Sequence, residues 1–466
     1  MAITAPRRPA ARLTAGLRRQ LDTLQTVSVS VGVMAPTLAM SITGVAAAGL
    51  IGRAAPLAYV AAALGVGLVA YGFVRLSSVV AHAGSVYGFV GHALGPAAGF
   101  VAGWALLGTY LVFPAVSISA AAVFGRALLD TAGIAGNAPW LPLALMAWAT
   151  IWWLASRQIR TAARSLLAIE GASMLLILVL MALIVIALLD GSAPRGQGVD
   201  LHVFALPSGT DASTLALAST FGFLSFAGFE AAGSLGEEAH EPRRMVPRSI
   251  VVAIAVGGVF YVACTAVQSM GFGTDDAGAT RFAASGAPLS ELATTYVGRG
   301  MAIALDVAAI VSALGAGLGC ASVSARMLFA LGRDRRLDRR LAHVSSLTGA
   351  PARGLAFVMV FDAATLVVFA IFGAAPMNAF FYLATVGVLS LLAMYVLTNA
   401  AAVRFLAARG ARAELVLPAA GIAVAGYVLY HNVWPVPDFP FDVFPYLVAA
   451  WLLVGIGLAL TRRRRV

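Results

Sequence analysis

The hydrophobic positions of this chain fall in long runs that are separated by short polar segments. A run of roughly 20 apolar residues has the length of an α-helix that crosses a bilayer. We count twelve such runs, which begin near Val27, Pro56, Pro96, Pro139, Ser165, Ser213, Arg248, Met301, Gly354, Pro376, Leu415 and Phe444. The pattern predicts an all-α integral membrane protein with about twelve transmembrane helices.

The composition excludes several classes of protein. Of the 466 residues, 61% are hydrophobic and 11% are charged, against about 25% charged in soluble domains. All 31 basic residues are arginine, which excludes a Schiff-base lysine or a P-loop lysine. The segments between the runs are too short for a catalytic domain, so we expect no enzyme.

The arginines also predict an orientation. If the N-terminus lies in the cytoplasm, 26 of the 31 arginines fall on the cytoplasmic side of the predicted spans. The five on the outer side are Arg53, Arg126, Arg195, Arg281 and Arg299. The positive-inside rule therefore predicts a multi-pass protein with both termini cytoplasmic. We expect the membrane to be the plasma (cell inner) membrane.

Two of the predicted spans carry signs of a helix break. Pro36 lies in the middle of the first span, where it removes a backbone hydrogen-bond donor. The sixth span contains Gly222, Gly228 and Gly233 together with the carboxylate of Glu230. An ionisable group within the membrane costs free energy, so by default it is expected to interact with ions or substrate.

The two breaks are five spans apart, which is the spacing of an inverted repeat of five helices. We therefore divide the chain into a cytoplasmic tail (1–25), a first repeat (26–190), an extracellular loop (191–212), a second repeat (213–405), and helices 11 and 12 with a basic C-terminal tail (406–466). Broken helices of this kind offer free amides to a carboxylate and free carbonyls to an ammonium group near the midplane.

Three segments resemble the amino acid–polyamine–organocation (APC) superfamily of permeases. They are Gly84-Ser85-Val86-Tyr87-Gly88, then Phe226-Ala227-Gly228-Phe229-Glu230 with Glu241-Pro242-Arg243-Arg244, and Ser324-Ala325-Arg326-Met327. The resemblance covers about residues 25–405. It implies the LeuT-like 5+5 inverted repeat with helices 1 and 6 broken, plus two C-terminal helices.

The resemblance also implies site residues. Contact with substrate is expected from Ala35, Pro36, Thr37, Leu38 and Ala39 in helix 1, from Thr109 and Tyr110 in helix 3, and from Ser225, Phe226, Ala227, Gly228 and Phe229 in helix 6. Glu230 is expected to sense protons. Some relatives carry a lysine in helix 5, where this chain instead offers Glu170, which we predict to take part in proton coupling.

These observations together predict a secondary active transporter of amino acids or related amines that works by alternating access and is driven by protons rather than sodium. An amino acid exchanger and a non-transporting membrane sensor with a permease fold stay open as alternatives. The expected partners are the amino acid or amine substrate, protons and membrane lipids, with no nucleic acid. Scattered histidines predict no metal site, and we expect no cofactor.

Two further side-chain groups have structural explanations. Asp362 is interpreted as a hydrogen-bonded or protonated carboxyl between helices. The tryptophans, including Trp104 and Trp451, are interpreted as aromatic anchors at the membrane interface.

Overall fold

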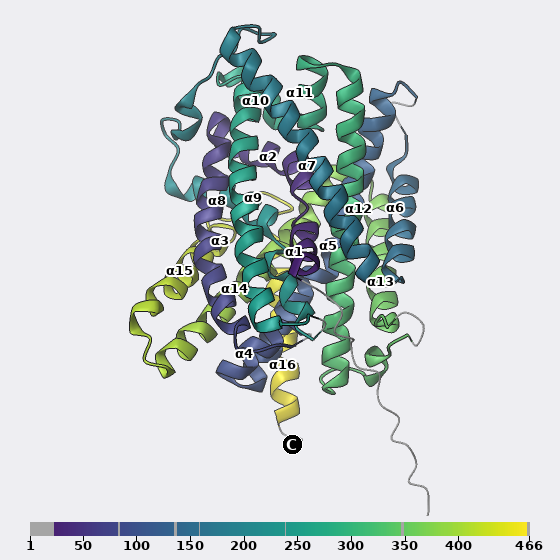
Figure 1. Ribbon diagram of the computed structural model, residues 1–466, viewed down its shortest axis with the longest axis vertical. Coiled ribbons are helices and arrows are strands. Elements are labelled where there is room, and N and C mark those ends of the chain that lie inside the picture. Colours follow the sequence, from purple (N-terminus) through teal and green to yellow (C-terminus); the bar gives the residue numbers. More distant parts are fainter. Residues whose placement is uncertain are drawn as a thin grey trace, which may run out of the picture.

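The computed structural model describes residues 23–82, 84–134, 138–157, 159–237, 239–345 and 349–463. Within these residues the fold consists of α-helices, 3₁₀ turns and loops, with no β-strand (Figure 1). This confirms the all-α prediction. Most of the predicted N-terminal tail and the last residues of the predicted C-terminal tail, 1–22 and 464–466, lie outside the described residues.

The helices follow the predicted runs closely. The first half holds α1 (Thr23–Met34), α2 (Pro36–Ile51), α3 (Ala55–Ser77), α4 (Val86–Leu94), α5 (Pro96–Thr131), α6 (Trp140–Ala155) and α7 (Ile159–Asp190). The second half holds α8 (Ala212–Phe226), α9 (Pro242–Phe272), α10 (Asp276–Ala284), α11 (Pro288–Tyr296), α12 (Arg299–Arg333), α13 (Ala352–Ile371), α14 (Pro376–Ala408), α15 (Val416–His431) and α16 (Phe444–Arg463). The 3₁₀ turns are η1 (Gly52–Ala54), η2 (Leu201–Phe204), η3 (Phe229–Leu235), η4 (Arg339–Ala342) and η5 (Arg412–Leu415).

Ten helical stretches in the described residues are long and apolar enough to cross a membrane. The first of them, Thr23–Ser77, spans 55 residues and holds the first two predicted spans. The fourth predicted span corresponds to α6, a shorter apolar helix of 16 residues. The protein is therefore a multi-pass membrane protein, and the count of twelve spans stays a prediction.

Three short helices were not predicted. The helices α4, α10 and α11 have nine residues each. Nine residues are too few to form a membrane-length apolar run, so the pattern that reveals spans misses these helices. Figure 1 places α10 and α11 at one end of the bundle, and α4 lies at the other.

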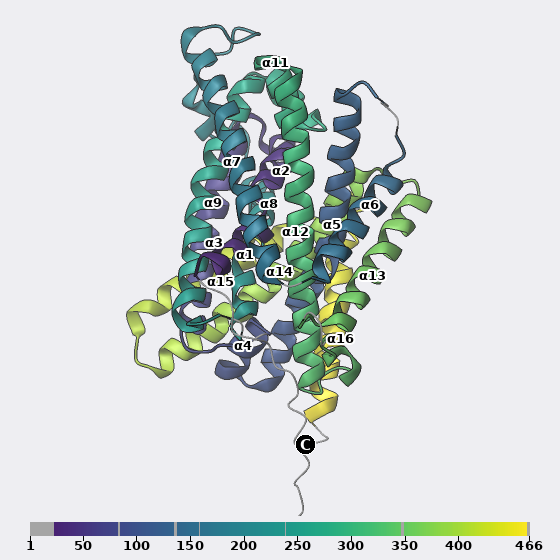
Figure 2. The same ribbon diagram turned by 45° about the vertical axis from the view of Figure 1, so that its right-hand side comes forward.

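The long helix α5 lies at the centre of the bundle and packs against α12, α14, α4 and α16. Hydrogen bonds tie it to α14, because the Thr109 hydroxyl donates to the Gly387 carbonyl (2.9 Å) and the Ser390 hydroxyl donates to the Ala105 carbonyl (2.7 Å). At the edge of the bundle α6 and α13 lie side by side (Figure 2). The central helix thereby connects both halves of the chain.

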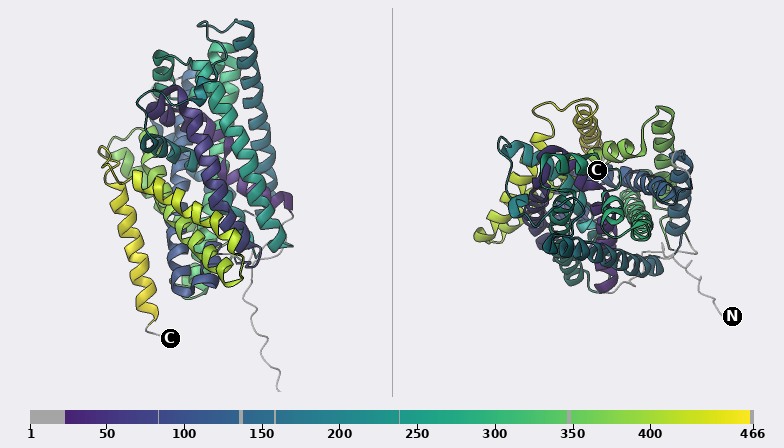
Figure 3. Two further views of the ribbon diagram at one scale, coloured as in Figure 1. Left: turned by 90° about the vertical axis from the view of Figure 1, so that its left-hand side faces the viewer. Right: turned by 90° about the horizontal axis from the view of Figure 1, so that it is seen from above.

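The last helix, α16, stands on the outer edge of the bundle (Figure 3) and is fastened to α5 by two tryptophans. The Trp104 indole N–H donates to the Trp451 carbonyl (2.8 Å), and the Trp451 indole N–H donates to the Trp104 carbonyl (2.9 Å). Their rings stack with centroids 4.3 Å apart. Each indole N–H is therefore bonded to the neighbouring helix, and the interpretation of these two residues as interface anchors stays a prediction.

Candidate functional site

The first predicted break is present between α1 and α2. Ala35 has a φ of 44°, in the left-handed region, and separates the two helices. Pro36 occupies the first turn of α2, where its missing N–H costs nothing because that group would have no helical partner. The chain thus ends one half-helix at Met34 and begins the next directly afterwards.

The first backbone amides of α2 have no partner within the helix, and they bond to side chains of other helices instead. The Thr37 backbone N–H donates to the Glu170 carboxylate oxygen Oε1 at 2.7 Å, and the Leu38 N–H donates to the Ser312 hydroxyl at 3.1 Å. The Ser312 side chain also interacts with the Glu170 carboxyl. Glu170 is 3% exposed, so α7 and α12 close the N-terminus of α2 with a buried carboxyl and a hydroxyl.

The second predicted break lies between α8 and η3. The helix α8 ends at Phe226, and Gly228 follows with a φ of 118°. A Cβ atom on Gly228 would lie 2.7 Å from the Val33 side chain and 2.8 Å from the Met34 backbone nitrogen. Only glycine fits there, both for its φ and for its space, and the two breaks therefore touch each other.

Glu230 lies just beyond this break and is 1% exposed. Its Oε1 accepts a hydrogen bond from the Tyr110 hydroxyl at 2.8 Å. Its Oε2 accepts longer bonds of 3.3 Å from the Gly228 N–H and the Tyr395 hydroxyl. The carboxyl is thus held by α5, α14 and the break itself, and a change in its charge acts on all three.

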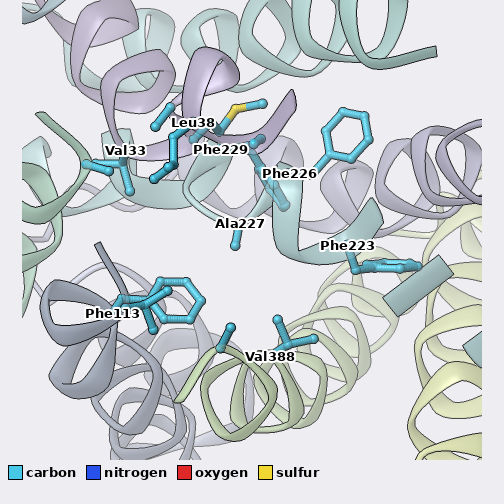
Figure 4. Close-up of a cluster of buried hydrophobic side chains, with 14 of the residues drawn as sticks. Val33, Leu38, Phe113, Phe223, Phe226, Ala227, Phe229 and Val388 are labelled. Atoms are coloured by element: carbon cyan, nitrogen blue, oxygen red, sulfur yellow. The ribbon is translucent and has the colours of Figure 1, made fainter. Parts of the chain in front are cut away.

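A cavity of about 50 Å³ lies between the two breaks. It is lined by Val33, Met34, Ala35, Leu38, Ala39, Ile42, Thr43, Phe113, Val116, Ser117, Leu224, Ser225, Ala227, Ala316, Cys320 and Phe380. None of these described lining residues carries a formal charge. Figure 4 shows Ala227 between Val33 and Leu38 on one side and Phe113 and Val388 on the other.

A hydroxyl network supports the cavity wall. The Thr43 hydroxyl lies 2.6 Å from the Tyr59 hydroxyl and 3.0 Å from the Ser225 hydroxyl. The Tyr261 hydroxyl donates to the Ser225 carbonyl at 2.8 Å, and the Ser30 hydroxyl donates to the Phe229 carbonyl at 2.9 Å. These bonds hold α1, α2, α3 and α9 around the second break.

The structure divides the predicted substrate residues into two sets. Those that line the cavity are Ala35, Leu38, Ala39, Ser225 and Ala227. Those that lie behind its wall are Pro36, Thr37, Thr109, Tyr110, Phe226, Gly228 and Phe229. Phe226 packs on Tyr261 with ring centroids 5.0 Å apart, and Phe229 packs on Phe73 and Tyr395 at 5.4 and 5.5 Å. The second set positions the site.

Sequence reasoning missed several residues of this site. Tyr395, Tyr261 and Phe113 lie within ordinary apolar runs, where an aromatic residue gives no signal of its own. Their roles depend on contacts between residues far apart in the chain, as in the Tyr395–Glu230 pair, which is separated by 165 positions.

Asp362 is fully buried in α13. Its carboxyl interacts with the backbone amide of Ala115 in α5. Its interpretation as a protonated or hydrogen-bonded carboxyl between helices stays a prediction.

An ion-pair cluster, which we call the latch, lies at the arginine-rich end of the bundle. Arg333 at the end of α12 contacts both Glu237 carboxylate oxygens, at 2.9 and 3.2 Å. His82 Nε2 lies 3.8 Å from Asp334 Oδ2, and His82 Nδ1 accepts a bond from the Gly84 N–H. Burial lowers the pKa of the His82 imidazole, and Glu237 and Asp334 oppose that shift. The latch thus joins α12 to the segments after α3 and after η3.

The opposite end of the bundle is more open. A pocket of about 460 Å³ lies there between the end of α5, the α10–α11 segment and the start of α14. Its charged lining residues are Arg126, Asp130 and Glu291. The two ends of the bundle are therefore different, with ion pairs at one and a wide pocket at the other.

Comparison with known proteins decides the family. The family model described as amino acid permease matches residues 21–457. The chain belongs to the amino acid permease family. This amino acid permease is 24% identical to the low-affinity putrescine importer PlaP of Escherichia coli K12, with 68% of each chain covered.

Other relatives of the permease agree with this assignment. It is 26% identical to an uncharacterized transporter of Mycobacterium tuberculosis H37Rv, over 97% of this chain and 92% of the relative. It is also 26% identical to the branched-chain amino acid permease BcaP of Lactococcus lactis, over 72% of each chain. The permease is therefore a membrane transporter of the APC superfamily and not an enzyme.

Proposed function

We propose that this permease is a secondary active transporter that moves amino acids or related amines across the plasma membrane by alternating access, coupled to protons rather than sodium. One observation carries the proposal most directly: two helix breaks touch each other beside a buried cavity, and each break is hydrogen-bonded to a buried carboxyl. Broken helices at a central cavity are the construction of transporter sites. The substrates named for two relatives, putrescine and branched-chain amino acids, support this solute class.

The difference between the two ends of the bundle supports alternating access. The latch closes the arginine-rich end, which the positive-inside rule assigns to the cytoplasm together with both termini. The wide pocket then faces the outside. In this proposal the LeuT-like repeats of residues 26–190 and 213–405 rock against each other, and the latch must open before substrate is released inside.

Glu230 and Glu170 are the proposed coupling groups. Both are buried, and both accept hydrogen bonds from backbone amides at a break. A proton that arrives at either carboxyl weakens its hold on that amide, because a charged acceptor makes the stronger hydrogen bond. Protonation would thereby loosen the break and link proton binding to the motion of the half-helices.

The test is uptake by proteoliposomes from a mixed pool of amino acids and amines, under a pH gradient, a sodium gradient or neither. We expect accumulation only under the pH gradient. Accumulation under sodium alone would overturn the proton coupling. Exchange of internal for external solute without any gradient would favour the exchanger, and binding without movement of any solute would favour the sensor.

A further inference from the structure

The electrostatics of the central cavity point to a narrower class of substrate. Two half-helices, α1 and α8, end at the cavity with Met34 and Phe226. The C-terminal end of a helix carries about −0.5 of an elementary charge from its unpaired carbonyls. Both of these ends favour a cation, and both lie beside cavity-lining residues, namely Ala35 and Ala227. In α8 the Ser225 carbonyl already accepts a hydrogen bond from the Tyr261 hydroxyl.

The N-terminal end of α2 would favour an anion, but side chains of the protein itself already bond to its backbone amides. The helix α2 spans 16 residues, and its first residue is a proline without an N–H. The next two amides donate to Glu170 and Ser312. A substrate carboxylate would have to displace the Glu170 carboxyl, which is buried and bound at 2.7 Å.

The remaining cavity wall offers no positive charge to a carboxylate among its described lining residues. Among its described lining residues no arginine or histidine is present. The polar lining groups are the hydroxyls of Thr43, Ser117 and Ser225 and the thiol of Cys320. Thr43 and Ser225 are already bonded to each other. A carboxylate buried here without a cation would be strongly unfavourable.

The same wall suits an ammonium group with an apolar tail. Phe113 and Phe380 line the cavity and present aromatic rings, whose faces attract cations. The rest of the lining is mostly aliphatic, so a second charge on the substrate would lack a partner. The volume of about 50 Å³ fits only a small solute.

We infer that the central cavity selects a small organic monoamine without a carboxylate, because Glu170 holds the position that a substrate carboxylate would take. This inference rests on the proposed transport function and narrows its solute class. Glu170 is then a specificity-determining residue. Its carboxylate occupies the amide that a substrate carboxylate would need, and it adds a negative charge near the site.

A matched pair of ligands tests the inference. Leucine and 3-methylbutylamine share one apolar tail and differ only by the carboxylate. We would measure the binding of both to the full chain in lipid nanodiscs by titration calorimetry. The parent protein should bind the amine at least about tenfold more tightly than leucine, the scale of one helix-terminus interaction.

Two substitutions of Glu170 separate the effect of its negative charge from the effect of its hydrogen bond to the Thr37 N–H. Glu170→Ala frees the Thr37 N–H, so the affinity ratio of amine to leucine should fall about tenfold or more. Glu170→Gln keeps an oxygen that can accept from Thr37, so it should weaken amine binding without improving leucine binding. The matched control is Asp306→Asn, since Asp306 is also buried but bonds to the Thr131 and Ser290 hydroxyls; it should leave the ratio unchanged.

The outcomes distinguish this inference from the transport function. Tighter binding of leucine by the parent protein, or an unchanged ratio in Glu170→Ala, overturns the inference. Counterflow of both ligands is then measured in proteoliposomes. Preferred transport of leucine refutes the selectivity and leaves the transport function standing, whereas selective binding of the amine with no movement of any solute refutes the transport function alone.

Discussion

At the scale of single residues, the buried carboxyls differ in what holds them. Glu230 accepts from two tyrosine hydroxyls and one amide, Glu170 accepts from an amide beside Ser312, and Asp362 interacts with the Ala115 backbone amide. A hydrogen bond to a charged acceptor is worth about 1.5–3 kcal/mol. A change in the charge of Glu230 therefore changes the strength of its hydrogen bonds to α5, α14 and the second break.

Glu230→Gln should flatten the dependence of transport on pH while substrate binding is retained. The glutamine keeps an oxygen for the Tyr110 hydroxyl but carries no titratable charge. Initial uptake rates at a series of pH values measure the effect. The matched variant Tyr395→Phe removes one donor to Glu230 and should keep the pH dependence; a wild-type profile in Glu230→Gln would contradict the role.

His82 should make the latch sensitive to acid. Because burial lowers its pKa in the folded protein below the ordinary 6.5, the folded latch favours neutral His82. That stabilisation is complete above about pH 6.5 and is lost as the pH falls through the folded pKa. Protonation of Nδ1 would also remove the bond from the Gly84 N–H.

The measurement is the drop in Tm between about pH 7.5 and about pH 5.5. The drop should be smaller in His82→Gln than in the parent protein, because the glutamine does not titrate. An equal drop in both proteins would show that the latch is not acid-sensitive through this residue.

At the scale of helices, the crossing of α4 and α5 depends on glycine. A Cβ on Gly99 would lie 2.6 Å from the Gly91 Cα and 2.6 Å from the Tyr87 carbonyl oxygen. Both are backbone atoms, so the helices themselves would have to separate. Gly67 in α3 is exposed, and a Cβ added there would meet no atom within 4 Å, which makes it a matched helical control.

Gly99→Ala should therefore destabilise the protein by about 1–3 kcal/mol, the usual cost of overpacking. Gly67→Ala should leave stability unchanged or raise it slightly, because alanine is the better helix former. Thermal unfolding of both variants in the same detergent compares them. Equal Tm values would mean that the α4–α5 crossing yields without cost.

The helices also show what the sequence could reveal. Apolar runs predicted where the long helices lie, and Pro36 predicted the first break. The left-handed residue at that break is Ala35, a residue type with no preference for positive φ. The bond from Thr37 to Glu170 joins residues 133 positions apart, and local patterns contain no information on such pairs. Hence the breaks were foreseeable, but the occupied amide was not.

At the scale of the whole molecule, the latch joins α12 to the segments after α3 and after η3 at one end of the bundle. Its centre is the contact of Arg333 with both Glu237 oxygens, and the central cavity above it is lined by Cys320, which is 2% exposed. Opening of the latch is therefore expected to expose a thiol that the closed protein hides.

Arg333→Ala in a Cys264→Ala background should raise the rate of Cys320 modification by a hydrophilic thiol reagent several-fold, since a bidentate arginine–carboxylate contact is lost. Labelling in nanodiscs followed by mass spectrometry measures the rate. Arg353→Ala, at an exposed arginine of the same end, is the control and should not change it. Equal rates in all three proteins would mean that other contacts keep this end closed.

The tryptophan pair of α5 and α16 has a consequence for biosynthesis. Trp104 and Trp451 are 347 residues apart in the chain, so at about 5–20 residues per second the ribosome needs roughly 20–70 s to supply the second indole after the first. Until then, the Trp104 N–H lacks its partner in α16. The surface of α5 that α16 will cover is also without that contact. The central helix is thus among the first to be inserted and among the last to be completed, which leaves it open to cellular quality control for most of the time the protein takes to be made.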